Sequence, residues 1–194
     1  MRFLLDPKAL LTFARQTVSA PRPMARFLMG VGLSRSVLLQ FYLLLTVLAG
    51  MVKIAFFALM PLPPEVELPA SLAYGYTVFE AVVGLIVAYG AYAIGRAFGG
   101  TGSFDQSLTL VIWAQFILFL VSLLQLVVLV FLPPVTDVIT VMALVLFFWL
   151  MVNFVTELHG FTSPALVFVG FILSLMALAF VLSLLLPVLG MALV

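Results

Sequence analysis

The chain has 194 residues, of which 66% are hydrophobic and 8% charged, and its mean hydropathy is +1.39. A soluble domain could not cover that much apolar surface with eight basic and seven acidic side chains, whereas lipid needs no such cover. The net charge of +1 excludes the concentrated basic face of a nucleic-acid-binding protein, and the lack of cysteine excludes disulfides and thiolate metal sites.

Residues 1–35 form a basic tail in which we expect two short amphipathic helices. Asp6 followed by Pro7 is a helix-start signal, because the carboxylate caps the first turn and proline there loses no hydrogen bond. Prolines at positions 21 and 23 end this helix, and a second covers about 24–33. Basic amphipathic helices lie in the lipid interface rather than cross it. The alternative is a cytosolic tail that packs on the protein's own loops.

Five apolar runs follow, each long enough to cross a hydrocarbon layer of roughly 30 Å. None shows the period-two alternation of a barrel strand, so we expect helices that satisfy their own backbone hydrogen bonds. The predicted fold class is all-α, an integral membrane bundle of five transmembrane helices preceded by short amphipathic interfacial helices. The membrane domain covers 36–188, and its spans are about 36–59, 72–95, 107–132, 137–156 and 164–186.

The basic residues predict how the chain is oriented in the membrane. Six of them precede the first span, and Arg96 lies in the second connection, whereas the first and third connections carry only acidic charges: Glu65, Glu67 and Asp137. Since cytoplasmic segments are enriched in Lys and Arg, the amino terminus is expected in the cytoplasm and the carboxyl terminus outside. Zero cysteines and heavy Leu, Val and Phe usage fit a bacterial cytoplasmic (inner) membrane.

Two charged residues lie inside the predicted spans. Lys53 is about six residues from the outer end of the first span, and Glu80 is about eight residues into the second. Adjacent antiparallel helices bring both to the same depth, so an intramembrane ion pair is one interpretation. The other is that Lys53 extends outward to the interface while Glu80 is protonated or faces a water pocket.

Two polar islands interrupt the apolar runs, residues 96–106 and 157–161, and the predicted orientation places both at the cytoplasmic boundary. We expect Arg96, Asp105, Glu157 and His159 to form a polar cluster that ties the second and fourth connections together. Its ion pair is Arg96 with Glu157 or Arg96 with Asp105, and the sequence leaves both open.

These residues do not predict catalysis. His159 is the only histidine, so no HExxH zinc motif exists. The glycine-rich segment has no P-loop lysine, and Ser103 lacks the strand–turn–helix setting of a nucleophile elbow. We therefore expect no catalytic, cofactor-binding or metal-binding residue.

The motifs around these islands resemble the Yip family, the membrane proteins named for interacting with Ypt/Rab GTPases, in its prokaryotic branch. The resemblance covers about residues 20–187 and rests on the five spans and on four sequence features. These are GRAFGGTGSFDQSLTLVIW at 95–113, Pro133-Pro134, Glu157-Leu-His-Gly-Phe161, and the pair Trp113 and Trp149. It implies a protein that acts through partner binding rather than catalysis. The amino-terminal tail lacks the DLYGP-type segment of eukaryotic members.

Two function classes follow. The first is a non-enzymatic membrane scaffold or adaptor that contacts lipids and binds protein partners, as a membrane complex or homo-oligomer, at its cytoplasmic face or through its spans. The second is a small permease or channel-like protein that uses Lys53, Glu80 and polar residues of the third span. Few intramembrane ionisable groups and no evident inverted repeat disfavour the second class.

Overall fold

A computed structural model describes residues 7–60 and 70–188, and the described part is all helical. Its helices are α1 (Pro7–Ser19), α2 (Pro21–Gly30), α3 (Arg35–Leu59), α4 (Ala70–Ala97), α5 (Phe104–Phe131), α6 (Val135–His159) and α7 (Pro164–Val188). The sequence features that we assigned to Arg2, to the first connection with Glu65 and Glu67, and to the carboxyl end at 189–194 lie outside the described residues.

Local sequence explains several helix boundaries. Ser103 caps α5 in a capping box, in which its hydroxyl accepts from the Gln106 backbone N–H and the Gln106 side chain accepts from the Ser103 N–H. Gly160 ends α6 with φ +69°, a left-handed conformation that favours glycine. Pro21 occupies the first turn of α2, where its missing N–H costs no hydrogen bond.

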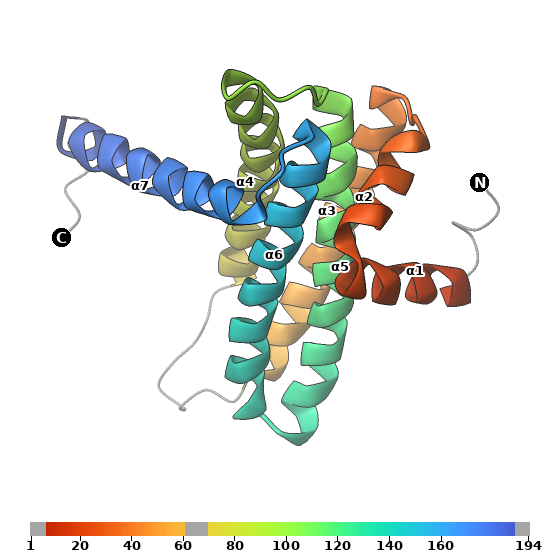
Figure 1. Ribbon diagram of the computed structural model, residues 1–194. Helices are drawn as coiled ribbons and strands as arrows, with labels where there is room; N and C mark the ends of the chain where they lie inside the picture. The colour runs from red at the N-terminus through yellow and green to blue at the C-terminus, as the bar shows by residue number, and fades with distance from the viewer. Residues whose placement is uncertain (1–6, 61–69, 189–194) are drawn as a thin grey trace.

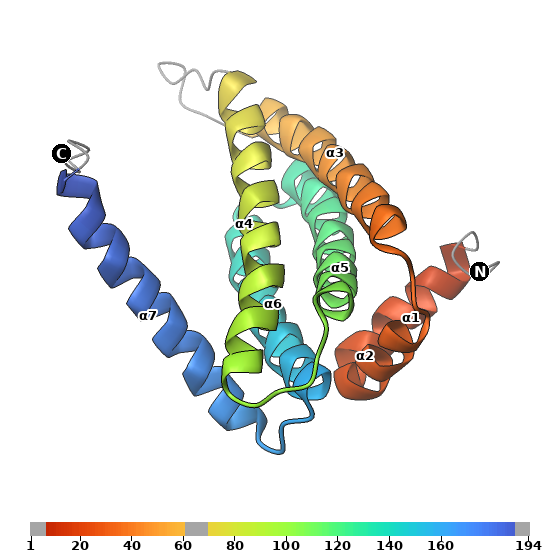
Figure 2. The same cartoon turned by 90° about the horizontal axis from the view of Figure 1, so that it is seen from above.

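Helices α3 to α6 run alongside one another as a bundle (Figure 1). Helix α7 leaves the bundle in both views and packs on α6 near its own start, where Phe168 and Phe171 make edge contacts with Phe148 (Figure 2). Most of the described α7 side chains beyond this contact are therefore exposed within the chain.

Four helices of the described chain are long and apolar enough to cross a membrane: Arg35–Leu59, Ser71–Ala97, Phe104–Phe131 and Val135–His159. They correspond to the first four expected spans. Helix α7 (Pro164–Val188) stands at the position of the fifth, and its fully described residues form an apolar helix over Pro164–Ala177. The count of five spans therefore stays a prediction.

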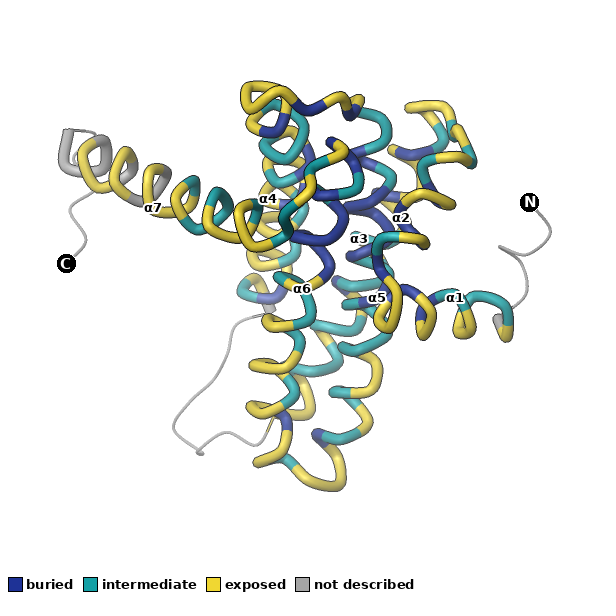
Figure 3. The backbone as a smooth tube through the Cα atoms, viewed as in Figure 1, coloured by how far each residue is buried: buried dark blue, intermediate teal, exposed yellow. Residues whose placement is uncertain are grey.

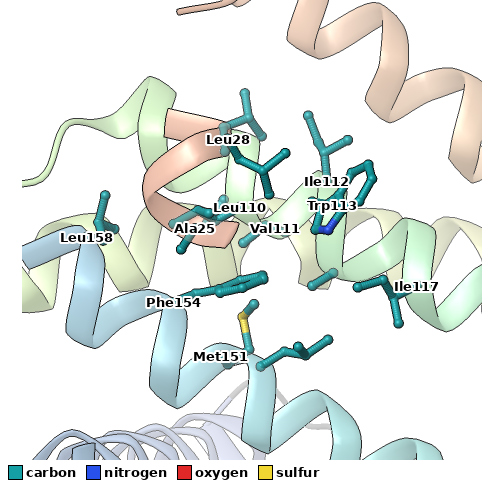
Figure 4. Packing of buried hydrophobic residues seen from close by; sticks show 14 of the residues in the cluster. Ala25, Leu28, Leu110, Val111, Ile112, Trp113, Ile117, Met151, Phe154 and Leu158 are labelled. Atoms are coloured by element: carbon teal, nitrogen blue, oxygen red, sulfur yellow. The ribbon is translucent and has the colours of Figure 1, made fainter. Parts of the chain in front are cut away.

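The packed core lies at one end of the bundle (Figure 3). Its centre is formed by the first turns of α5 and the last turns of α6, with α2 laid across them, and Figure 4 shows Leu110, Val111, Met151 and Phe154 meeting there. Toward the other end, α3, α5 and α6 expose apolar side chains on most of their outward surface. Such a surface is stable against lipid, which supports a chain that is held in a membrane.

The two expected amino-terminal helices, α1 and α2, pack against the bundle. Trp113 of α5 donates its indole N–H to the Thr17 hydroxyl at 2.8 Å, and Trp149 of α6 donates to the Val18 carbonyl at 3.2 Å. Helix α2 buries Met24, Ala25 and Leu28 in the core. Part of the tail is thus packed on the protein, while α1 keeps Leu11, Arg15 and Val18 exposed.

Candidate functional site

His159, the last residue of α6, is buried and joins three segments of the chain. Its Nε2 lies 2.9 Å from the Ala91 carbonyl of α4, and its Nδ1 accepts the Gly102 backbone N–H at 3.3 Å. Since Nδ1 accepts, these partners assign the ring proton to Nε2, which donates to Ala91. The ring also stacks on Phe161 at 5.4 Å between centroids.

Three glycines between the last turn of α4 and the start of α5 make room for Leu158 and His159 at the end of α6. A Cβ on Gly95 or Gly100 would overlap the His159 ring, and one on Gly102 would overlap Leu158. The glycine-rich segment is therefore a close-packing surface for the end of α6. The second connection therefore meets the end of α6 at His159, and the polar cluster of Arg96, Asp105, Glu157 and His159 as a whole stays a prediction.

Glu157 lies in the last turn of α6 and binds two arginines of α2. Its Oε1 accepts from Arg26 Nη2 at 2.7 Å and Nε at 2.8 Å, and its Oε2 is 3.8 Å from Arg22 Nε. Arg22 also donates through Nη2 to the Phe161 carbonyl at 3.1 Å. The Glu157 side chain is only 14% exposed, so these charge-assisted hydrogen bonds hold α2 on the bundle.

Asp105, in the first turn of α5, binds Arg35 at the start of α3 with 2.7 Å between Nε and Oδ1. The Arg35 guanidinium also lies over the Phe104 ring, 5.3 Å from its centroid. Both charged side chains are well exposed, so the pair positions the start of α3 but adds little stability.

The expected ion pair of Arg96 with Glu157 or Asp105 is wrong. Within the described residues, both carboxylates bind arginines of the amino-terminal 35 residues instead, and Arg96 is exposed at the end of α4. We missed Arg22, Arg26 and Arg35 because their contacts depend on where the tail folds back. The spacing of Arg22 and Arg26, one helical turn apart, was the signal that could have indicated a shared carboxylate.

Lys53 of α3 and Glu80 of α4 lie together as an ion pair between Lys53 Nζ and Glu80 Oε2. The Lys53 side chain is 20% exposed, whereas the Glu80 side chain is 60% exposed on the outside of the bundle. The pair is far from the His159 region: Glu80 is fifteen residues before Gly95, about 22 Å along α4.

Other polar side chains of the spans bond to nearby groups. Ser107 donates to the Ala88 carbonyl at 2.7 Å and joins α5 to α4. Gln125 donates to the Thr136 carbonyl at 3.1 Å and to the Thr140 hydroxyl at 2.6 Å, which joins α5 to α6. Asn153 donates to the Trp149 carbonyl within α6 at 2.8 Å. The bonds of Ser107 and Gln125 cross between helices and stabilise the packing of those helices.

Comparison with known proteins decides the family. The Yip1 domain model matches residues 17–185, which is most of the chain. This chain belongs to the Yip1 family. The predicted resemblance to the Yip family is thereby confirmed, and its prokaryotic branch stays a prediction. No curated protein and no solved structure matches it.

The Yip1 family is not known for enzymatic activity. In this member, the two side chains considered for catalysis in the sequence have structural contacts: Ser103 caps α5, and the imidazole nitrogens of His159 both bond to backbone groups. Among the described residues, no three His, Cys, Asp or Glu side chains gather as a metal site would require.

Proposed function

We propose that this Yip1-family protein is a non-enzymatic membrane scaffold or adaptor of the prokaryotic branch. It has five spans in a bacterial cytoplasmic membrane, with the amino terminus in the cytoplasm and the carboxyl terminus outside. It binds protein partners at its cytoplasmic face or laterally through its spans.

One observation carries this proposal: three described polar side chains of the spans bond to a neighbouring helix or to the backbone of their own helix. Ser107, Gln125 and Asn153 each have a protein partner. A small hollow between α4, α5 and α6 has room for about 10 Å³, roughly the space of one water. A permease needs a wet route between its polar groups, so this arrangement favours partner binding.

The cytoplasmic face has a surface suited to partner binding. Phe98, at the end of α4, is 77% exposed, and Arg96 beside it is exposed without a carboxylate partner among the described residues. Aromatic and arginine side chains are the two types most enriched where binding energy concentrates. The proposed face is therefore the surface around these two residues, next to the rigid His159 contact.

Affinity purification from native membranes in mild detergent, with quantitative mass spectrometry, tests this face. We expect a defined protein to be retained by the wild-type chain and lost with Arg96→Glu, Phe98→Ser. Asp137→Asn, an exposed change near the start of α6, is the matched control and should retain it. Solute or ion flux through proteoliposomes that is abolished by Lys53→Met, Glu80→Met would overturn the proposal in favour of a permease.

A further inference from the structure

Glu80 combines a charge with an exposed position on a membrane helix. It lies ten residues after Ala70 and seventeen before Ala97, about 15 and 26 Å along α4 from the two ends. Its carboxylate is therefore within the span rather than at a helix end. A charged side chain facing hydrocarbon is costly, and residues of this kind normally face a protein interior or a partner.

The ion pair with Lys53 offsets only part of the free-energy cost of placing Glu80 in hydrocarbon. Lys53 meets Glu80 Oε2 from the α3 side, and its own Nζ is buried. No described residue bonds to the other carboxylate oxygen of Glu80, Oε1. The Glu80 side chain is 60% exposed, so this oxygen can be reached from outside the bundle. A carboxylate oxygen can accept further hydrogen bonds, and one left without a donor in lipid keeps its desolvation penalty.

The surface beside Glu80 has the shape of a helix-packing seam. Tyr76, Phe79, Val83 and Ile86 recur at spacings of three, four and three residues and are exposed. We call these four residues the α4 stripe. Spacing of this kind is the pattern by which one helix packs along another. A shallow hollow of about 450 Å³ lies at its outer end, where Gly75 has open space beside Tyr76 and Phe79.

We propose that the α4 stripe and Glu80 form a lateral docking site for a transmembrane helix of another protein. That helix carries a neutral hydrogen-bond donor, an Asn, Gln, Ser or Thr side chain, at the depth of Glu80. The donor bonds to Glu80 Oε1, and the apolar side chains around it pack on the stripe.

The net charge of the Lys53–Glu80 pair indicates which kind of helix fits this site. The Lys53–Glu80 pair is neutral as a whole, so a second cation would leave an unbalanced charge in hydrocarbon, whereas a neutral donor satisfies Oε1 without one. A second copy of this chain, related by a two-fold axis through the stripe, would bring two Glu80 carboxylates together. Each carboxylate is already balanced by its own Lys53, but neither supplies the hydrogen-bond donor that the other Oε1 lacks, so the occupant is a different protein.

This site rests on the proposed function, because it names the lateral partner surface of the scaffold. It is tested with the full chain in liposomes and a synthetic leucine-rich transmembrane peptide as probe. One peptide carries a single Asn at the depth of Glu80, a second carries Leu there, and a third carries the Asn in the opposite leaflet. Because the chain has no cysteine, a single introduced cysteine can carry the donor dye, and the peptide carries the acceptor dye. Association is then measured as energy transfer from the protein to the peptide. Peptide self-pairing is measured without protein and subtracted.

We expect the first peptide to associate about fivefold more strongly than the other two, the effect of roughly one interhelical hydrogen bond. The preference should disappear with Lys53→Met, Glu80→Met, whose folding is checked by circular dichroism. Equal association of all three peptides would overturn the proposed site. Energy transfer between two copies of the chain would also overturn it if Lys53→Met, Glu80→Met abolishes that transfer, because the occupant would then be a second copy. Either result leaves partner loss with Arg96→Glu, Phe98→Ser untouched, so failure of this site and failure of the scaffold function are distinguishable.

Discussion

Arg26 and Glu157 are 131 residues apart, yet Arg26 directs both Nε and Nη2 to one carboxylate oxygen of Glu157. The contact joins the second helix of the chain to the end of α6. The Arg26 side chain is 76% exposed and that of Glu157 is 14% exposed. The Glu157 carboxylate therefore depends more on this contact for its hydrogen bonds than the water-exposed Arg26 does. A change at Glu157 should therefore release α2 more than a change at either arginine alone.

Glu157→Gln should loosen α2 without unfolding the bundle. It removes the charge that two arginines share and keeps a neutral acceptor, so we expect a loss of about 1 kcal/mol in unfolding free energy. Hydrogen exchange should accelerate in residues 21–30. Asp137→Asn removes an exposed carboxylate near the far end of α6 and serves as control. Unchanged exchange in α2 would show that apolar contacts alone hold it.

Gly95→Ala should destabilise the protein, whereas Gly90→Ala should not. Both glycines are in α4, where alanine normally adds about 0.5–1 kcal/mol of helix stability. A Cβ at Gly90 meets only an ordinary contact with Ile94, but one at Gly95 overlaps the His159 ring. We expect Gly95→Ala to cost about 1–3 kcal/mol in a detergent unfolding titration. Adding His159→Ala removes the overlap, so the double variant should regain part of the loss contributed by Gly95→Ala.

Trp113→Phe and Thr17→Val should show coupled effects on stability. Each removes one partner of the same buried hydrogen bond, so each costs about 1–3 kcal/mol, and the double variant costs less than their sum. The measurement is a double-mutant cycle from unfolding titrations. Trp149→Phe is the comparison, because Trp149 is half-exposed and should lose less. Strict additivity of the first pair would contradict the bond.

Labelling of single cysteines should establish the orientation. Thr101→Cys and Thr162→Cys change exposed residues of the two connections that meet near His159, and Asp137→Cys lies near the opposite end of the bundle. With an impermeant maleimide on intact cells, only Asp137→Cys should react, and the other two should react after permeabilisation. Reaction of Thr101→Cys and Thr162→Cys from opposite sides would contradict the shared cytoplasmic boundary.

The helical fold and its four long apolar helices could be predicted from composition and run length. Lipid allows few alternatives, because each apolar run must form a helix in which the backbone groups hydrogen-bond to one another. The adjacency of Lys53 and Glu80 followed from depth counted along antiparallel neighbours, and the structure places them together. The sequence also predicted that the two polar islands lie together, and His159 accepts a hydrogen bond from Gly102 of the first island.

The partners of the charged residues could not be predicted in the same way. Arg96 and Arg26 are equally plausible partners of Glu157 by charge, and only the path of the tail across α5 and α6 decides between them. That path depends on apolar packing of Met24, Ala25 and Leu28, whose spacing predicts an apolar helix face but not the surface on which this face packs. The ring contacts of Phe168 and Phe171 with Phe148 likewise could not be predicted from the uniformly apolar sequence of α7.

The order of synthesis gives the amino-terminal contacts a consequence for biogenesis. Thr17, Val18 and Arg26 leave the ribosome early, but their partners are 96 and 131 residues downstream. Helices α1 and α2 can therefore take their final places only after α5 and α6 have been inserted. Until then the tail's positive charges stay available to fix the direction of insertion, and attachment of the tail becomes the closing step of maturation. A truncated chain that stops before α6 should keep its amino-terminal helices accessible to protease.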